Sequence, residues 1–399
     1  MDKVKKIMER WNSLQPLPER DRELLSRRFT IDFNYNSNHI EGNTLTYGQT
    51  EILLLFGKVV GEAEVRDVQE MTASNVGLKM MTEEAAVKNV PLTQNFIRTL
   101  HKTLLREDYT VYRNLPGGQT TCYTIHAGQY KTRPNSVITR YGDRFEYASP
   151  EETPSLMTDL VDWYNEAEQS GKFTPVELAA IFHYRYIRIH PFEDGNGRIA
   201  RLLVNYILSR HGYPMIVVRS RKKNEYLEAL HKTDLTVGAT PHLGAHASKR
   251  DIQQFLTYFT NLFVEEVSYN IQFLTERGEN VWWFDGERVK FRSPSTINML
   301  ILMYANPDIT INALAEQVGI NVAAVNKQLK QLYTKGYIQR AQNGEWRVII
   351  TQSIYEDGDR VSLLDTTPLL FVFCARTWFN YIFVDNFPYP IGSCFIIFQ

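Results

Sequence analysis

The chain has 399 residues, which is enough for two or three domains with cores of their own. Its formal net charge is −1 and its charges are well mixed, which argues against nucleic acid or an anionic membrane as the dominant partner. The first ten residues are charged, unlike a signal peptide, and no apolar run has the length of a membrane span. Cys122, Cys374 and Cys394 lack metal-site or disulfide-framework spacing, so we expect a cytoplasmic protein with reduced thiols and no membrane partner.

The first 270 residues are predicted to be mainly helical. Apolar residues recur there every three or four positions. A long helix is expected from Glu19 to Glu41, ending at Gly42 because glycine is a favourable residue after a helix end. Thr46 and Gln49 then form a predicted capping box that opens the next helix.

One stretch departs from the helical pattern. Residues from about Thr120 to Tyr147 alternate Thr, Tyr, Ile and Val, and they contain Gly128 and Pro134. With a turn at 141–143, this stretch is predicted to be a β-hairpin. Helices are expected to resume near Ser149-Pro150.

The residues from His190 to Arg201 carry the clearest chemical signal. A helix is expected to end at His190-Pro191, and a second to begin in the turn Asp194-Gly-Asn-Gly197, whose backbone N–H groups and positive helix end would bind an anion. Arg198 and Arg201 lie three residues apart and can reach further phosphate oxygens. Asp194 is a suitable Mg²⁺ ligand, and His190, with a pKa near neutrality, is suited to take a proton from an attacking hydroxyl.

Taken singly, each of these features has a simpler explanation, such as a turn, a core histidine or a solvated helix face. Their order over twelve residues resembles the signature of the Fic family: His-Pro-Phe, two variable residues, Gly-Asn-Gly-Arg, two variable residues and Arg. Every fixed position of that signature is present. P-loop and protein-kinase motifs are missing from the sequence, so ordinary NTPase and kinase chemistry is not supported.

The resemblance implies a role for each residue of the motif. His190 would be the general base, Phe192 the apolar anchor of the loop, and Asp194 the magnesium ligand. Gly195, Asn196 and Gly197 would hold the α- and β-phosphates of ATP, with the Asn196 amide near the α-phosphate. Arg198 would bind the β-phosphate and Arg201 the γ-phosphate.

The resemblance also implies residues outside the motif. The hairpin around residues 128–131 and Val137, Ile138 and Thr139 would be a flap that pairs with the target protein. Tyr226 and Asp234 are candidates for the adenine pocket, although helix packing explains Tyr226 equally well. Asn205 could contact the ribose or be a capped surface amide.

A second motif, Ser37-Asn-His-Ile-Glu41-Gly42, lies at the end of the long N-terminal helix. Helical spacing places Ser37 and Glu41 on one face. Taken alone, a glutamate at a helix end is usually solvated. The motif resembles the inhibitory motif of class II Fic proteins, in which the glutamate pairs with the second arginine of the signature, here Arg201. Such a pair would occupy the arginine that the γ-phosphate needs.

From about Ser293 the pattern predicts a winged helix-turn-helix. Helices are expected over Ile297–Tyr304, Ile311–Val318 (capped by Thr310) and Val322–Lys335, followed by two strands with a turn at Asn343-Gly344. The second helix of the helix-turn-helix offers Lys327 and Lys330, with Lys335 at its end, but a DNA reader would be more basic. A packing or docking module is favoured over DNA binding.

The expected organisation is an N-terminal helical region with the inhibitory helix (1–90), a Fic catalytic core with a β-hairpin flap (91–250), connecting helices (251–292), a winged helix (293–352) and an apolar tail (353–399). The tail is either a packed strand pair or a non-native extension.

The expected function is transfer of AMP from Mg-ATP to a Ser, Thr or Tyr hydroxyl of a target protein, or of the chain itself, under inhibition by Glu41. Removal of AMP, transfer of a different group, and a nucleotide-sensing transcriptional regulator stay open as alternatives. A homodimer also stays open.

Overall fold

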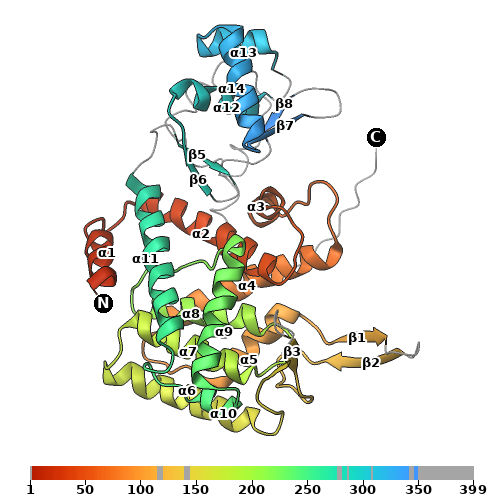
Figure 1. Cartoon of the computed structure of the whole chain (residues 1–399), viewed down its shortest axis with the longest axis vertical. Coiled ribbons are helices and arrows are strands. Elements are labelled where there is room, and N and C mark those ends of the chain that lie inside the picture. The colour runs from red at the N-terminus through yellow and green to blue at the C-terminus, as the bar shows by residue number, and fades with distance from the viewer. Residues whose placement is uncertain are drawn as a thin grey trace, which may run out of the picture. The chain divides into compact units, whose positions relative to one another are not determined.

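The structure is a computed structural model that describes residues 2–114, 120–138, 144–275, 281–284, 287–306, 309–340 and 346–348. The predicted turns at 141–143 and Asn343-Gly344 and the apolar tail lie outside these residues. The described part is mainly helical, as predicted (Figure 1). None of its helices combines the length and the apolar character of a membrane span.

Eleven α-helices and one short 3₁₀ helix lie in the described part of residues 2–275. Their bounds are α1 Asp2–Asn12, α2 Glu19–Ile40, α3 Tyr47–Phe56, α4 Val65–Ala86, α5 Gln94–Leu105, α6 Thr153–Ser170, α7 Pro175–Ile189, α8 Asn196–Arg210, η1 Ser220–Lys222, α9 Lys223–Val237, α10 Pro241–Ala245 and α11 Gln253–Thr275. The long predicted helix is α2, and it ends one residue before Glu41, its C-cap. The predicted capping box of Thr46 and Gln49 opens α3.

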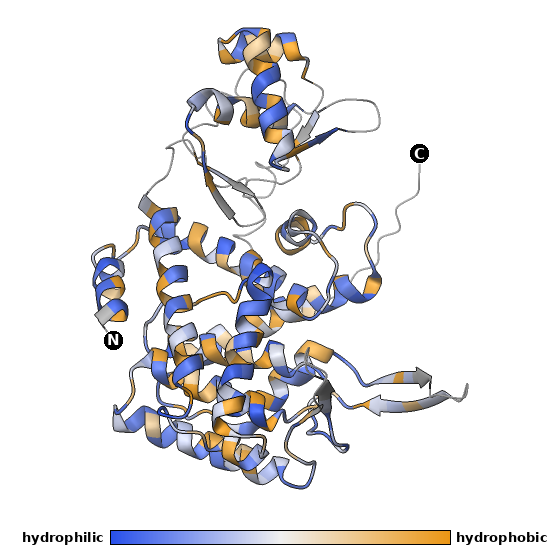
Figure 2. Cartoon of the chain, in the orientation of Figure 1, coloured by the Kyte–Doolittle hydropathy of each residue, from blue (hydrophilic) through white to orange (hydrophobic). Residues whose placement is uncertain are grey.

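Helices α7 and α8 lie at the centre of the core of this helical body. They pack on each other, α4 contacts α8, and α6, α10 and α11 contact α7. Nearly every residue of α7 is buried, because a helix surrounded by neighbours has no solvent face. The outer helices carry hydrophilic and hydrophobic residues on different sides (Figure 2). The two central helices are therefore a rigid support for the loop that joins them.

The predicted hairpin over 120–147 is wrong in its extent, because the structure divides it between two ribbons. Strand β2 (Thr120–Ile125) pairs with β1 (Tyr109–Asn114), which the sequence analysis did not predict. Only β3 (Ser136–Ile138) and β4 (Arg144–Glu146) pair across the expected turn. The next helix begins at Thr153, after a turn in which Ser149 and Glu152 exchange hydrogen bonds.

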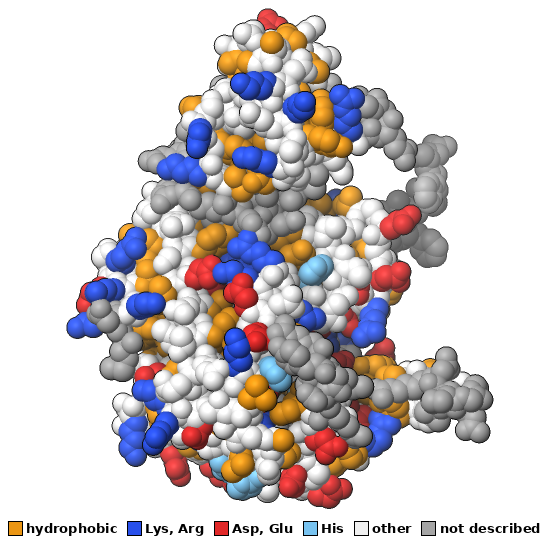
Figure 3. Space-filling model, viewed as in Figure 1, with side chains coloured by type: hydrophobic (Ala, Val, Ile, Leu, Met, Phe, Trp, Pro, Cys, Tyr) orange, Lys and Arg blue, Asp and Glu red, His pale blue; other side chains and the backbone are white. Residues whose placement is uncertain are grey.

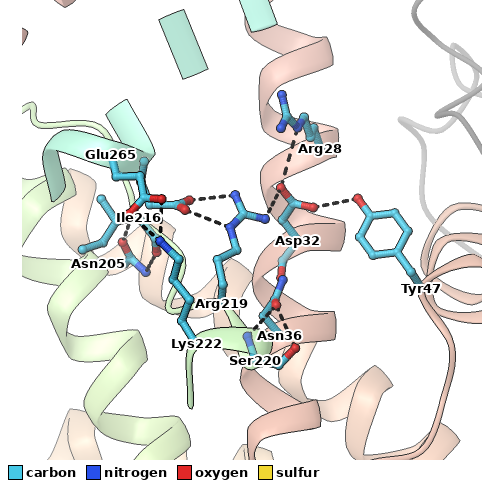
Figure 4. A network of polar contacts seen from close by, with 11 residues as sticks. Arg28, Asp32, Asn36, Tyr47, Asn205, Ile216, Arg219, Ser220, Lys222 and Glu265 are labelled. Carbon is cyan, nitrogen blue, oxygen red and sulfur yellow. Dashed lines mark hydrogen bonds and ion pairs between the residues drawn. The ribbon is translucent and has the colours of Figure 1, made fainter. Parts of the chain in front are cut away.

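Helix α2 is fixed to the body by a buried charge cluster (Figure 4). The Arg219 guanidinium donates to both carboxylate oxygens of Glu266 on α11, at 2.8 and 2.7 Å, and to Asp32 on α2 at 2.9 Å. Asp32 also accepts a hydrogen bond from the Tyr47 hydroxyl at 2.7 Å. The residue after Arg219, Ser220, donates its backbone N–H to the Asn36 side chain on α2 at 2.8 Å. A buried charge that loses its partner costs several kcal/mol, so this cluster holds the middle of α2 firmly.

The second folded unit is a winged helix with a core of its own, as predicted. It contains α12 Pro294–Ala305, α13 Ile311–Val318, α14 Val322–Thr334, β7 Ile338–Arg340 and β8 Trp346–Val348. The expectation of connecting helices over 251–292 is wrong for its second half. Residues 281–290 contain the hairpin of β5 (Val281–Phe284) and β6 (Glu287–Lys290), and Trp282 belongs to the core of the winged unit.

Candidate active site

The loop between α7 and α8 begins at His190. Helix α7 opens with a capping box between Thr174 and Glu177. It ends where His190 adopts the left-handed conformation, with φ 52°, and donates its N–H to the carbonyl of Tyr186 at 2.9 Å. Pro191 cannot continue the helix, because it lacks an N–H. Left-handed backbone is uncommon for a residue other than glycine and is concentrated at functional sites.

Phe192 holds the loop to the core. Its ring is fully buried and stacks on the His101 ring at 3.7 Å between centroids, with 4° between the planes. The Asn196 side chain closes the loop on itself, accepting from the N–H of Phe192 at 3.0 Å and donating to its carbonyl at 2.7 Å. The Asn196 side-chain amide is therefore engaged inside the loop. Its backbone N–H, at the start of α8, remains the group that can face a phosphate.

The N-terminus of α8 has the geometry of an anion site. Gly195 is its N-cap with φ 75°, and Asn196, Gly197 and Arg198 follow as the first helical residues. The first N–H groups of a helix have no partner within the helix and carry its partial positive charge. A Cβ added to Gly197 would lie 2.4 Å from Oε1 of Glu41, so only glycine allows this close approach.

The two predicted motifs meet at Arg201. This buried guanidinium donates to the Ser37 hydroxyl at 3.0 Å, to the Ser37 carbonyl at 2.9 Å and to Oε1 of Glu41 at 2.6 Å. Gly42, with φ 101°, turns the chain directly after Glu41. Burial raises the pKa of Glu41, but the charge and the hydrogen bond of Arg201 outweigh it and hold that pKa below its usual value. A charged carboxylate thus lies against the N-terminus of α8.

Asp194 is held from two sides by residues outside the motif. Its Oδ2 accepts from the Tyr109 hydroxyl at 2.8 Å and from Arg198 at 3.4 Å, and its carbonyl lies 3.0 Å from Nε2 of His101. Burial raises the pKa of Asp194, but Arg198 and the Tyr109 hydroxyl lower it further than burial raises it. About a third of the side chain, 36%, is exposed. The carboxylate is therefore charged and accessible.

His190 is more buried than the sequence suggested. Its ring stacks on Tyr147 at 3.9 Å between centroids. Burial lowers the pKa of His190 to about 3, and the nearby Lys131 ammonium adds to this shift. The expectation of a pKa near neutrality is therefore wrong for the protein without nucleotide, because desolvation and a cation both disfavour the imidazolium.

Three of the predicted nucleotide contacts are engaged elsewhere. Asn205 donates to the Ile216 carbonyl at 2.9 Å and accepts from its N–H at 2.8 Å, so its amide holds the backbone and is not free for a ribose. Tyr226 is buried, and its hydroxyl lies 3.0 Å from Nε2 of His183. Asp234 accepts from the Tyr184 hydroxyl at 2.8 Å and from Arg188 at 3.2 Å.

Arg201, Asn205 and Tyr226 all line one small cavity of about 10 Å³. This volume is near the limit for a single water molecule and far too small for an adenine ring. Without nucleotide, Asn205 and Tyr226 both contact protein groups, and their contacts with ribose and adenine stay predictions. Asp234 keeps a partly exposed carboxylate, with 19% of its side chain accessible.

The predicted flap is described in part. Val137 and Ile138 lie in β3, and Thr139 lies outside the described residues. Residues 128–131, expected in the same hairpin, are not in a strand: a turn over 126–129 ends the β2 strand region and residues 130 and 131 lie outside any helix or strand. Periodicity gave no indication of four residues that contact the loop or its aspartate: His101, Tyr109, Lys131 and Tyr147. Of these four, only Lys131 belonged to a segment, residues 128–131, that was expected near the site as part of the flap hairpin.

Comparisons with known proteins match both folded units. The Fic/DOC family model matches residues 91–208, and a winged helix-turn-helix DNA-binding model matches residues 292–339. A solved structure of a Fic domain containing signaling protein from Bacteroides thetaiotaomicron is 52% identical, with a TM-score of 0.63, over 68% of this chain and 96% of that one.

Two curated relatives are protein adenylyltransferases. Protein adenylyltransferase fic-1 of Caenorhabditis elegans is 32% identical over 202 residues, which are 50% of this chain and 36% of the relative. Protein adenylyltransferase Fic of Nematostella vectensis is 30% identical over 200 residues, which are 50% of this chain and 42% of the relative. This chain thus matches less than half the length of either relative.

Proposed function

Because this chain belongs to the Fic/DOC family, we propose that it is a protein adenylyltransferase, which moves AMP from ATP onto a Ser, Thr or Tyr hydroxyl of a target protein. The observation that supports this most directly is the α8 N-terminus. This helix start brings together the backbone of Gly195–Gly197, the buried Arg198 and Arg201, and the accessible carboxylate of Asp194. Asp194 lies four residues after His190, which has a left-handed conformation. This set suits a triphosphate and a proton acceptor at one place.

The proposed reaction is an in-line displacement at the α-phosphorus. The target oxygen forms a bond to this phosphorus, the bond to pyrophosphate breaks, and His190 takes the proton of the hydroxyl. Arg198 and Arg201 would hold the β- and γ-phosphates. The negative charge of a bound triphosphate would raise the pKa of His190 from about 3 toward the range in which an imidazole accepts protons efficiently.

Asp194 would hold Mg²⁺ together with phosphate oxygens. Among the described residues no group of three or more acidic, His or Cys side chains could hold a metal ion alone. Mg²⁺ bound to nucleotides commonly uses one or two carboxylates, with water and phosphates as its other ligands, so a single exposed aspartate fits. The ion would neutralise charge on the phosphates, and the residues of this chain would keep Asp194 turned toward it.

Glu41 would restrain the enzyme. Its carboxylate lies against Gly197 and binds Arg201, which are two of the groups proposed for phosphates. ATP and Glu41 therefore compete for Arg201. The same carboxylate is close enough to the loop to favour a second function, in which Glu41 orients a water molecule that removes AMP from a modified hydroxyl.

Incubation with ATP, Mg²⁺ and candidate targets, followed by mass spectrometry, tests the function. We expect a gain of one AMP on a target residue or on the chain itself. A gain of phosphate or UMP with the matching nucleotide would assign a different transferred group. Loss of AMP from a modified protein would favour the reverse reaction, and nucleotide binding without any adduct would favour a nucleotide-sensing regulator.

The winged unit is proposed to dock a protein or the body of the chain, with DNA as the weaker alternative. Exposed Lys327 and Lys330 lie on α14, and Figure 3 shows more basic than acidic side chains on the visible face of this unit. However, Gln328 accepts from Thr296 at 2.8 Å and donates to Ser295 at 2.9 Å, so it is engaged within the unit and not free to read a base.

A homodimer and a cytoplasmic location are further proposals. Large apolar side chains are exposed where α3 leads to α4, at Phe56, Val59, Val60 and Val65. Exposed large apolar side chains that gather along one segment are a common feature of protein interfaces. The sparse cysteines and near-neutral charge suit the cytoplasm.

A further inference from the structure

The segment 131–135 runs alongside the catalytic loop, residues 189–193. The Lys131 ammonium donates to the carbonyls of Ile189, at 3.0 Å, and His190, at 2.9 Å, and the Lys131 N–H donates to Pro191 at 2.9 Å. Further along, the Asn135 amide donates to the Phe192 carbonyl at 3.0 Å. Four successive loop carbonyls, from 189 to 192, are therefore held by two residues of this segment.

The segment is also anchored to Glu193. The Arg133 guanidinium donates to Oε2 of Glu193 at 3.1 Å, and the N–H of Thr132 donates to its Oε1 at 3.3 Å. Strand β3 begins at Ser136, directly after the segment. A shift of the segment would therefore move the first flap strand and the catalytic loop together.

Lys131 is the centre of this arrangement. It is buried, with 3% exposure, and its ammonium has a third acceptor in Oδ1 of Asn135 at 2.9 Å. All three of its donor positions thus have partners, two of them at the carbonyl end of α7, where the helix dipole attracts a cation. Burial lowers the pKa of Lys131 to about 7, so carrying its charge here is costly unless these acceptors are in place.

His190 needs this support because of its backbone. Its φ of 52° is one of two positive values among the described non-glycine residues. A non-glycine residue in this conformation costs about 1–3 kcal/mol and persists only when its surroundings fix it. The ammonium holds the carbonyl on each side of the His190 N–Cα–C unit, and Tyr147 stacks on the ring.

We propose that Lys131 is a positioning residue for His190, holding the catalytic base in its left-handed conformation and in register with the flap. This rests on the proposed function in one respect, the role of His190 as the base. Lys131 would act through the loop carbonyls and would not touch the nucleotide. Its removal should therefore slow transfer without weakening the binding of ATP.

The test compares Lys131→Met and Lys131→Arg in the full chain carrying Glu41→Gly, so that transfer is measurable. We expect Lys131→Met to lower kcat by about 10- to 100-fold, with the Kd of ATP unchanged within about threefold. Lys131→Arg keeps a cationic donor and should recover most of kcat. Lys88→Met is the matched control, because Lys88 also donates to a carbonyl at a helix end, that of Arg210, which is at the opposite end of α8 from the catalytic loop. It should leave kcat unchanged.

A second readout does not depend on transfer. With ¹³C-labelled histidine, the NMR signals of the His190 ring are assigned by their absence in His190→Ala. Lys131→Met should shift or broaden these signals, whereas Lys88→Met should not. Of the groups whose charges act on His190, Glu41 is already replaced in the parent and Asp194 is kept, so the comparison changes only Lys131.

Unchanged His190 signals in a folded Lys131→Met protein would overturn the proposal, as would a kcat within threefold of the parent. If Lys131→Met does not fold, Asn135→Ala removes one acceptor of the ammonium and one loop contact, and the same two measurements decide. If the Glu41→Gly parent binds ATP but transfers nothing, the proposed function fails, while the NMR comparison still decides the role of Lys131.

Discussion

At the scale of single residues, a change at His190 tests the proposed general base apart from ATP binding. His190 lies before the turn proposed to bind the phosphates, so its loss should leave the nucleotide contacts intact. We expect His190→Ala to slow AMP transfer by about 10²–10⁴-fold, the usual effect of removing a general base, with the Kd of ATP nearly unchanged. Labelled ATP measures the rate, and calorimetry measures the affinity. Transfer within a few-fold of the parent would remove His190 from the mechanism.

Asp194 is the residue that tests magnesium. We expect Asp194→Asn to raise the Mg²⁺ concentration needed for half-maximal transfer and to lower the maximal rate, because an amide is a weaker ligand for a hard dication. Tyr109→Phe is a useful companion, because it removes the hydrogen bond to Oδ2 and keeps the carboxylate. An unchanged Mg²⁺ dependence in Asp194→Asn would make this aspartate structural.

The sequence predicted the backbone of this loop well, and the reason is local. The helix end, the turn and the α8 N-terminus lie within twelve consecutive positions, so their spacing already contains their geometry. Lys131, Tyr147 and His101 reach the loop from distant segments, and no periodicity records such contacts. The expected near-neutral pKa of His190 was wrong for the same reason, because desolvation of a side chain depends on the packed body and not on the motif.

At the scale of elements, helix α2 ends at Ile40 and so places Glu41, the carboxylate proposed to restrain the enzyme, directly after its last turn. We expect Glu41→Gly to raise the transfer rate by roughly ten- to a hundred-fold, because a charged hydrogen bond of this kind is worth about 1.5–3 kcal/mol and opposes productive ATP binding. Self-modification measured with labelled ATP is the simplest readout.

The double variant Glu41→Gly with Arg201→Ala is the control, and it should lose the gain, since the freed arginine produces it. If Glu41→Gly abolishes activity instead, the glutamate takes part in chemistry and the removal of AMP becomes the better function. If the rate does not change, the contact with Arg201 does not restrain the enzyme.

Elements were predictable where one segment contains its own signal. Helix α2, the Thr46 capping box and the helices of the winged unit follow from local patterns. The β-hairpins were not predictable in this way, because strand pairing depends on two segments at once. The residues after β2 were a plausible partner for it, but β2 pairs with β1, which precedes it. The β5–β6 hairpin was missed because its packing face, including Trp282, completes a core that lies later in the chain.

At the scale of the whole molecule, three histidines with lowered pKa values, the buried His101 and His183 and the partly buried His190, are expected to make the body sensitive to acid. Burial lowers the pKa of His101 to about 4 and those of His183 and His190 to about 3. Above about pH 6.5 these rings are neutral in both the folded and the unfolded chain, so they add no pH dependence. Below it the unfolded chain binds protons that the folded chain does not, so the free energy of unfolding falls, by up to about 1.4 kcal/mol per pH unit for each ring.

Urea unfolding at pH 7.5, 6.5 and 5.5 measures this loss. His183→Phe should make the decline shallower, because it removes one titrating ring from an aromatic environment that includes Phe255. His39→Gln, at an exposed position, should leave the decline as it is. Constant stability from pH 7.5 to 5.5 would contradict the assignment of these rings as neutral in the folded chain.

The winged unit is expected to bind duplex DNA weakly, if at all. We expect no sequence-specific binding of duplex DNA tighter than about micromolar at physiological salt, because only a few exposed lysines on α14 are available and nonspecific binding lies in that range. Fluorescence anisotropy with random and selected duplexes measures this. Nanomolar, sequence-dependent binding would revive the transcriptional regulator.

The buried cluster of Arg219, Asp32 and Glu266 has a consequence for dosage. Since it secures α2 to the same folded body as the site, every molecule would carry the proposed restraint in a one-to-one ratio with its own site. Dilution or overproduction of the chain would not change the restrained fraction of a single chain, because the local concentration of the carboxylate is set by geometry alone. If Glu41 restrains transfer as proposed, the restraint is relieved when this one side chain, directly after the last turn of α2, moves away from Arg201.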